Sequence, residues 1–405
     1  MKFESAADRF GYSPLATRTL KYMGLMIFLL SVGEGLTAPA IPLYGGKLGA
    51  SYWQLGFLMT GYSITYTLMT VTSGRISDRI GRKKILLFSL AISIIASAGY
   101  YFSSVPLSLM VFRILEGMSR GILWPISEAI VAENTTLEGR SVSMGRFTAA
   151  YGSGVTIGTL AGGYLMDHVG ITAVFPFYPV LSAVVLVTTI LGISESETSD
   201  YQHSFELGIS KSSVKEEIKK IWPICSVGFA YSGFLYALWG LLSVVADSFA
   251  VSYTGIGVIF AIFWGGRLVA FLLSGELSLN LGRKRALILG ITLCIFSSGT
   301  FLRADTFSLL ILAATMGGLG TGLTFPLLVT LVADTVSSSF EGLGTGFLEF
   351  IMGIGMIVQT ALSGILGQVR GVQSTYLFTF IVTIVSLVVA VIFIQETRSE
   401  DDTAD

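Results

Sequence analysis

The stretch GRISDRIGRKK, Gly74 to Lys84, sets one acid, Asp78, among five arginines and lysines. The chain around it is 52% hydrophobic and only 13% charged, and its mean hydropathy is +0.75. Long apolar segments separated by short polar links are typical of a membrane-spanning protein. The charged stretch is therefore predicted to link two helices that cross a bilayer.

Twelve segments of the chain reach the roughly 20 apolar residues that a spanning helix needs. The predicted spans are 20–44, 53–75, 85–104, 106–132, 142–167, 170–193, 221–247, 254–277, 286–303, 306–333, 342–368 and 373–395. We expect an all-α membrane protein with two six-helix bundles, 1–193 and 221–405, the second ending in a short acidic tail. The polar link 194–220 joins them, and its end, SSVKEEIKK, is expected to form an amphipathic surface helix.

Lysines and arginines indicate the orientation, because they concentrate in cytoplasmic loops. With the N-terminus in the cytoplasm, 18 of them lie on the inner side and three, Lys47, Arg303 and Arg370, lie outside. We therefore expect both termini and the long link to be cytoplasmic, in a multi-pass protein of the plasma membrane.

Several classes of function find no support in the composition. A net charge of −1 gives no basic field to attract nucleic acid. No G-x-x-x-x-G-K-[ST] motif occurs, so we expect no nucleotide. The two cysteines, Cys225 and Cys294, lie in apolar runs, and no His, Cys and Asp cluster suggests a metal, a cofactor or a catalytic nucleophile. We therefore expect no enzyme.

The chain contains an internal repeat at a shift of 201 residues. Gly81-Arg82-Lys83 falls on Gly282-Arg283-Lys284, and Gly121 and Pro125 fall on Gly322 and Pro326. Two six-helix units of the same orientation are thereby predicted. Parallel repeats of this kind are typical of transporters, whose substrate site lies near the membrane midplane between the halves.

These residues resemble the major facilitator superfamily. GRISDRIGRKK is similar to its signature between spans two and three, and RILEG, from Arg113 to Gly117, is similar to its span-four motif with Glu116 in place of the common glutamine. SVGEGLTAPAIPLY, from Ser31 to Tyr44, resembles the first-span signature of the twelve-span drug:proton antiporter branch. GTLAGG, from Gly158 to Gly163, resembles the antiporter motif of span five but has Thr159 where that motif has proline.

The resemblance implies a gate on the cytoplasmic side. In the family, the aspartate of the loop meets the start of span eleven, here around Ser339–Gly342, and the arginines engage the acidic end of span four, here Glu133. The second copy of the repeat has Leu279 and Asn280 in place of Asp78 and Arg79. We expect Lys83 and Lys84 to serve only orientation. The expected gate residues are Gly74, Asp78, Arg79, Gly81, Arg82 and Glu133.

Ionisable side chains within spans are candidates for function, because an unpaired charge there costs several kcal/mol. On a helical projection the polar residues of span four fall within an arc of about 120°. This stripe is either a set of ion pairs that locks spans together or the wall of a cavity for substrate and protons, and the family favours the cavity. The expected pathway residues are Glu34, Arg113, Glu116, Arg120, Trp124, Glu128, Arg146, Arg267 and Glu349.

Glu34 and Arg113 fall at similar depths by helical rise, so they could pair. A carboxylate that loses its arginine in a dry site takes up a proton. We hypothesise that Glu34 or Glu116 couples transport to protons, with Arg113 as modulator. Arg267 and Glu349 could pair in the second half.

The spacing of Gly154, Gly158 and Gly162, with Gly163 beside them, predicts close helix packing, and the same face could slide during transport.

The sequence thus predicts a secondary transporter that works by rocker-switch alternating access, without a catalytic site. We expect export of small amphipathic or lipophilic compounds in exchange for protons, and the resemblance implies a monomer. A proton-linked or facilitative carrier of an organic anion or sugar is the alternative, suited by the three arginines of the first half. A non-transporting receptor is a remote alternative, because no link is long enough for a sensor domain.

Overall fold

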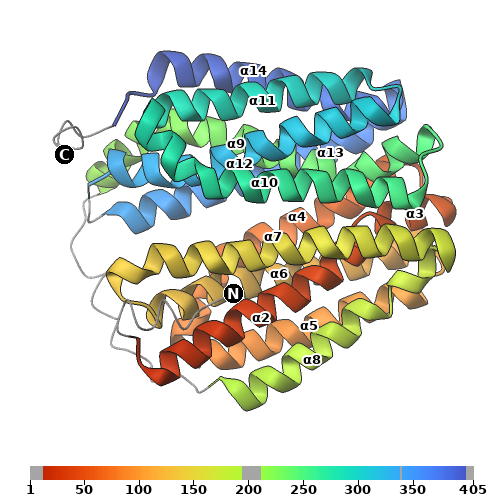
Figure 1. Ribbon diagram of the computed structural model, residues 1–405, viewed down its shortest axis with the longest axis horizontal. Helices are drawn as coiled ribbons and strands as arrows, with labels where there is room; N and C mark the ends of the chain where they lie inside the picture. Colours follow the sequence, from red (N-terminus) through yellow and green to blue (C-terminus); the bar gives the residue numbers. More distant parts are fainter. Residues whose placement is uncertain (1–11, 194–210, 338–339, 398–405) are drawn as a thin grey trace. The chain divides into compact units, whose positions relative to one another are not determined.

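The computed structural model describes residues 12–193, 211–337 and 340–397. Within these ranges the chain forms twelve helices of at least 16 residues and no strand. This confirms the predicted all-α membrane fold. Figure 1 draws these helices as coiled ribbons. Nine helical segments of the described chain are long and apolar enough to cross a membrane. The other three long helices are α4 (Tyr52–Ile80), α6 (Pro106–Glu133) and α7 (Leu137–His168).

The chain divides into two compact units. Unit 1 comprises Met1–Tyr201 and Val251–Trp264, and unit 2 comprises Gln202–Ala250 and Gly265–Asp405. The beginning of α10 (Tyr253–Leu281) therefore groups with unit 1, although the predicted boundary lies at 194–220. The domain limits predicted from sequence stay a prediction.

Unit 1 is built on the pairing of α2 with α7 and of α4 with α6. Helices α5 and α8 complete it, α5 packing on both α6 and α8. Its core is a continuous cluster of apolar side chains that includes Leu20, Met23, Leu90, Ile122 and Phe147. Besides α4, α6 and α7, its elements are α2 (Pro14–Thr37), α3 (Ala40–Lys47), α5 (Arg82–Phe102), η1 (Ile171–Val174) and α8 (Phe177–Gly192).

Unit 2 is built on the pairing of α9 with α13 and of α11 with α12, and α14 packs on α9 and α11. Its elements, besides the rest of α10, are α9 (Lys211–Ser248), α11 (Arg283–Arg303), α12 (Phe307–Thr335), α13 (Glu341–Arg370), η4 (Val372–Ser374) and α14 (Thr375–Phe393).

Two predicted elements differ from the structure. The expected first span, 20–44, is two helices, because α2 ends at Thr37 and α3 begins at Ala40. Pro39 and Pro42 lack the backbone N–H that a continuous helix needs there. The expected surface helix SSVKEEIKK is instead the beginning of α9, which runs without a break to Ser248.

The repeat seen in the sequence recurs in the backbone. Gly81 ends α4 with φ of 104°, and Gly282, 201 positions later, separates α10 from α11 with φ of 89°. Both are left-handed conformations that glycine adopts without steric cost. Gly49 has φ of 86°, and its equivalent, Ala250, has φ of 55° and is the only non-glycine residue with positive φ in the described chain. The positive φ of this turn is thus retained at position 250, where alanine stands in place of glycine.

The spaced glycines of α7 lie against α2. A Cβ on Gly158 would overlap the Val32 carbonyl oxygen and stand 3.0 Å from the Gly35 Cα, and one on Gly154 would overlap Ser31. Gly162 meets the backbone of Leu36 in the same way. These positions let the two helix backbones approach closely. Gly163 contacts the beginning of α10, within unit 1, where a Cβ would stand 3.0 Å from the Gly257 Cα.

Gly158→Ala is expected to lower stability by about 1–3 kcal/mol, because the added methyl group has no space between α7 and α2. Thermal unfolding of the purified protein in detergent measures the change. Gly145→Ala is the matched control on the same helix, since nothing lies within 4 Å of its Cβ position. Equal unfolding temperatures for the two variants would contradict the assigned contact.

Candidate functional site

The charged stretch Gly74–Lys84 forms a tight corner between α4 and α5. Arg82, the first residue of α5, donates to Glu133, the last residue of α6, at 2.7 Å, and Asp78 lies 3.7 Å from the same guanidinium. The second terminal nitrogen of Arg82 is buried and finds no hydrogen-bond partner in the described part of the chain. The contacts of Arg82 therefore connect α4, α5 and α6 of unit 1.

The acids of this corner differ in their environment. The Asp78 side chain is 64% exposed, and Arg79 is exposed as well. Partial burial raises the pKa of the Glu133 carboxyl above its ordinary value; Arg82 acts against this rise and Asp78 adds to it. Glu133 thus holds the corner within unit 1, whereas Asp78 faces outward. The expected partner of Asp78, around Ser339–Gly342, lies partly outside the described residues, so that contact stays a prediction.

Lys83 has a structural role that the sequence interpretation missed. Its ammonium donates to the carbonyl oxygens of Ile190 at 3.0 Å and Ile193 at 2.5 Å, at the end of α8. A lysine at this position satisfies carbonyls that have no partner within their own helix. The expectation that Lys83 serves only orientation is therefore wrong.

Unit 2 repeats the corner at equivalent positions. Arg283 forms an ion pair with Asp334, the counterpart of the pair between Arg82 and Glu133. Lys284 donates to the Val391 carbonyl oxygen at 2.8 Å, as Lys83 does to Ile190. Asp334 was not among the predicted site residues, although the 201-residue shift that aligns Arg82 with Arg283 also aligns Glu133 with it.

Two ion pairs lie inside unit 1 on α6. In the first, Arg113 donates to Glu116 one turn away on the same helix, and Tyr100 of α5 donates to the same carboxylate oxygen. The side chains of Arg113 and Glu116 are 7% and 2% exposed. The guanidinium also lies over the Tyr62 ring, 4.4 Å from its centroid. Glu116 is thus held by two donors and fully enclosed.

In the second pair, Arg120 donates to Glu34 of α2. The Arg120 side chain is 6% exposed and that of Glu34 is 15% exposed. Arg120 also donates to the Leu30 carbonyl oxygen at 3.4 Å. The pairing of Glu34 with Arg113 that the sequence suggested is therefore wrong, because Arg113 is engaged by Glu116. Arg120 is the one arginine that forms an ion pair with Glu34 among the described residues.

The remaining expected residues of unit 1 lie on α6 and α7. The Trp124 ring lies edge-on to Tyr151, with centroids 5.1 Å apart, and 5.7 Å from Phe147. Glu128 of α6 and Arg146 of α7 are both half-buried. The polar stripe on α6 is therefore continuous from a buried ion pair to partly exposed residues.

In unit 2, Arg267 and Glu349 do not form the pair that the sequence suggested. Arg267 of α10 donates to the Tyr231 hydroxyl at 2.5 Å, and Tyr231 stacks on Phe325 with centroids 5.7 Å apart. Glu349 of α13 is half-buried and makes no hydrogen bond or ion pair with any residue that the structure describes. The side-chain hydrogen bond that Arg267 donates thus goes to a tyrosine hydroxyl, on α9, and not to the carboxylate of α13. Glu349 is thus a carboxylate at membrane depth without a fixed counter-charge.

The residues described by the structure include no group of three or more His, Cys, Asp or Glu side chains arranged to hold a metal ion. Cys225 and Cys294 are buried free thiols on α9 and α11. The candidate functional groups are therefore ion pairs, aromatic rings and Glu349, an acid at membrane depth without an ion-pair partner among the described residues. Such groups suit binding and proton transfer.

Comparisons with known proteins agree with this arrangement. "Multidrug resistance protein 2" of Bacillus subtilis is 28% identical over 378 residues, covering 89% of this chain and 91% of its own length. "Quinolone resistance protein NorA" of Staphylococcus aureus is 25% identical over 250 residues, covering 58% of this chain and 63% of its own.

Solved structures share the fold. A crystal structure of the nucleoside transporter NupG superimposes with a TM-score of 0.75 at 15% identity, covering 93% of this chain and 100% of that one. The human organic anion transporter TETRAN superimposes with a TM-score of 0.67 at 17% identity, again covering 93% and 100%. The family model described as "Major Facilitator Superfamily" matches residues 23–236 and 224–404. The chain is therefore a multi-pass membrane transporter, not an enzyme, and belongs to the major facilitator superfamily.

Proposed function

We propose that this transporter exports small amphipathic or lipophilic compounds in exchange for protons, by rocker-switch alternating access. The observation that carries the proposal is the buried pair of Glu34 with Arg120, which joins α2 to α6. A carboxylate at membrane depth is stable either when it is paired or when it is protonated. A change of conformation that separates Glu34 from its one arginine would therefore bind a proton, and one that restores the pair would release it.

Glu34 suits this role better than Glu116. Glu116 accepts hydrogen bonds from both Arg113 and Tyr100 and is 2% exposed, so it would have to lose two donors at once. Glu34 has one charged partner and a partly accessible side chain. Arg120 thus replaces Arg113 as the modulator of the coupling acid. Arg113 and Glu116 act as a fixed support for α6.

The charge balance of unit 1 favours a neutral or cationic cargo over an anion. Arg113 and Arg120 are each offset by a carboxylate, so neither leaves an excess of positive charge. In unit 2, Glu349 has no counter-charge among the described residues, and an acid of this kind attracts a cationic group or a proton. The relatives named for multidrug and quinolone resistance are consistent with this choice.

The carrier of an organic anion or sugar remains the second candidate. It rests on the fold shared with a nucleoside transporter and an organic anion transporter, and on Arg146 as a further cation of α7. We further propose that both termini lie in the cytoplasm, on the strength of the lysine and arginine distribution. That the protein is a monomer of the plasma membrane is proposed from its membership of the major facilitator superfamily.

Glu34→Gln is expected to abolish the dependence of export on a pH gradient, because an amide at this position cannot exchange a proton. Proteoliposomes loaded with a fluorescent lipophilic cation, with and without an imposed gradient, measure this dependence. Glu116→Gln is the matched control, and its folded fraction is expected to keep gradient-driven export. Gradient-dependent export by Glu34→Gln would refute the assignment of Glu34 as the acid that couples transport to protons. Failure of the wild-type protein to export the lipophilic cation would refute the proposed cargo.

Asp78→Asn is expected to shift the population toward the inward-open state. The exposed carboxylate is suited to dock on a helix N-terminus, a contact worth about 0.3–1 kcal/mol, or about twofold to fivefold in population. Cysteine labelling of cytoplasm-facing positions measures the shift. The 3.7 Å contact with Arg82 adds little to unit 1, so the unfolding temperature should not change. Unchanged labelling would count against the gate.

A further inference from the structure

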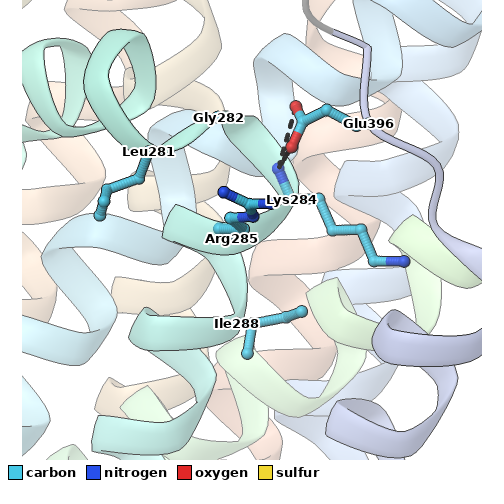
Figure 2. Close-up of a pocket in the computed structure, with 6 residues that line it drawn as sticks. All are labelled: Leu281, Gly282, Lys284, Arg285, Ile288 and Glu396. Carbon is cyan, nitrogen blue, oxygen red and sulfur yellow. Dashed lines mark hydrogen bonds between the residues drawn. The ribbon is translucent and has the colours of Figure 1, made fainter.

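A cavity of about 490 Å³ lies in unit 2 where α10 ends and α11 begins. Figure 2 shows its lining, which combines the basic residues Lys284 and Arg285 with the aliphatic residues Leu281 and Ile288. Gly282 and Glu396 complete the wall. A cavity with cations on one part of its surface and aliphatic side chains on another is suited to an amphiphile with an anionic head.

Glu396, the one acid among the residues that line this cavity, already accepts hydrogen bonds from the protein itself. The Glu396 carboxylate accepts hydrogen bonds from the backbone N–H groups of Arg283 at 2.8 Å and Lys284 at 3.2 Å, drawn as dashed lines for Lys284 in Figure 2. These N–H groups belong to the first turn of α11, whose dipole also favours a negative charge. Glu396 therefore caps α11, and its charge is balanced by the helix end.

The two basic side chains keep their positive charge available. Lys284 donates to the neutral carbonyl oxygen of Val391, which leaves its charge uncompensated. Arg285 is exposed and forms no hydrogen bond or ion pair with residues in the described part of the chain. An arginine in this situation presents a planar fork of donors that matches a phosphate.

Nearby aromatic residues indicate the depth of the cavity in the bilayer. Phe393, the last residue of α14, packs against Trp222 with ring centroids 5.0 Å apart, and both side chains are about half exposed. Tryptophan is enriched where the bilayer core meets the head groups. Glu396 follows Phe393 by three residues, so the cavity lies at the level of the head groups. Leu281 and Ile288 are placed to meet acyl chains.

We infer that this cavity binds the phosphate head group of an anionic phospholipid. Arg285 and Lys284 would contact the phosphate, and the aliphatic side chains would contact the first methylene groups. Under the proposed orientation the lipid belongs to the cytoplasmic leaflet. Binding itself requires neither proton coupling nor any particular cargo, so it can be tested apart from transport.

The test compares Arg285→Gln with Arg303→Gln, which removes the same charge from an exposed arginine at the other end of α11. Native mass spectrometry of the full-length protein in neutral detergent, titrated with phosphatidylglycerol or phosphatidylcholine of the same chains, measures lipid affinity. We expect Arg285→Gln to weaken phosphatidylglycerol binding by about fivefold, the effect of one basic residue at an anionic surface, and to leave phosphatidylcholine binding unchanged. Arg303→Gln should behave as wild type.

Two outcomes would overturn the inference. Equal phosphatidylglycerol affinity for Arg285→Gln and Arg303→Gln would show that the cavity does not select the lipid. Displacement of phosphatidylglycerol by glycerol 3-phosphate at equal concentration would show a site for a free phosphate ester, without a contribution from acyl chains. The unfolding temperature in phosphatidylcholine establishes that Arg285→Gln is folded, because Arg285 contacts no other described residue through its charge.

Discussion

Charge at membrane depth must be paired, and this requirement organises unit 1. Four of its charged side chains are at most 15% exposed, and they form two pairs, Arg113 with Glu116 and Arg120 with Glu34. A lone member of either pair would cost several kcal/mol in a dry interior. The pairs differ in connectivity, because the first lies within α6 and the second joins α6 to α2. Only the second can be broken by relative movement of two helices.

The same requirement acts at the corners, where helices end and backbone groups lose their partners. Each unit uses a positive-φ glycine to turn the chain, an arginine paired with the acid that ends or nearly ends a facing helix, and a lysine on terminal carbonyls. The corner therefore has a structural function common to both units. Asp78 stands apart, because the second unit has Leu279 at that position. The presence of an exposed acid in one copy alone is consistent with the gate role proposed for Asp78.

The sequence predicted the number of helices, the repeat and the family, since these depend on length, hydropathy and spacing. It failed where partner choice depends on packing. Glu34 and Arg113 were matched by depth alone, but the side chain that reaches Glu34 is Arg120, and Arg113 is held by Glu116 and by Tyr100 of a neighbouring helix. Likewise, Tyr231 binds Arg267 in place of Glu349. A tyrosine hydroxyl can accept a hydrogen bond from an arginine as a carboxylate can, and hydropathy does not predict which of the two an arginine meets.

The cap on α11 also bears on how the protein is made. Arg283 and Glu396 are separated by 113 positions, and Arg283 and Asp334 by 51. Helices α11 and α12 are therefore synthesised before Glu396, so its carboxylate cannot yet cap the first N–H groups of α11. The carboxylate that satisfies them arrives only after α14 has been synthesised. The corner of unit 2 is thus completed late in biogenesis, and until then other hydrogen-bonding groups must satisfy the open end of α11.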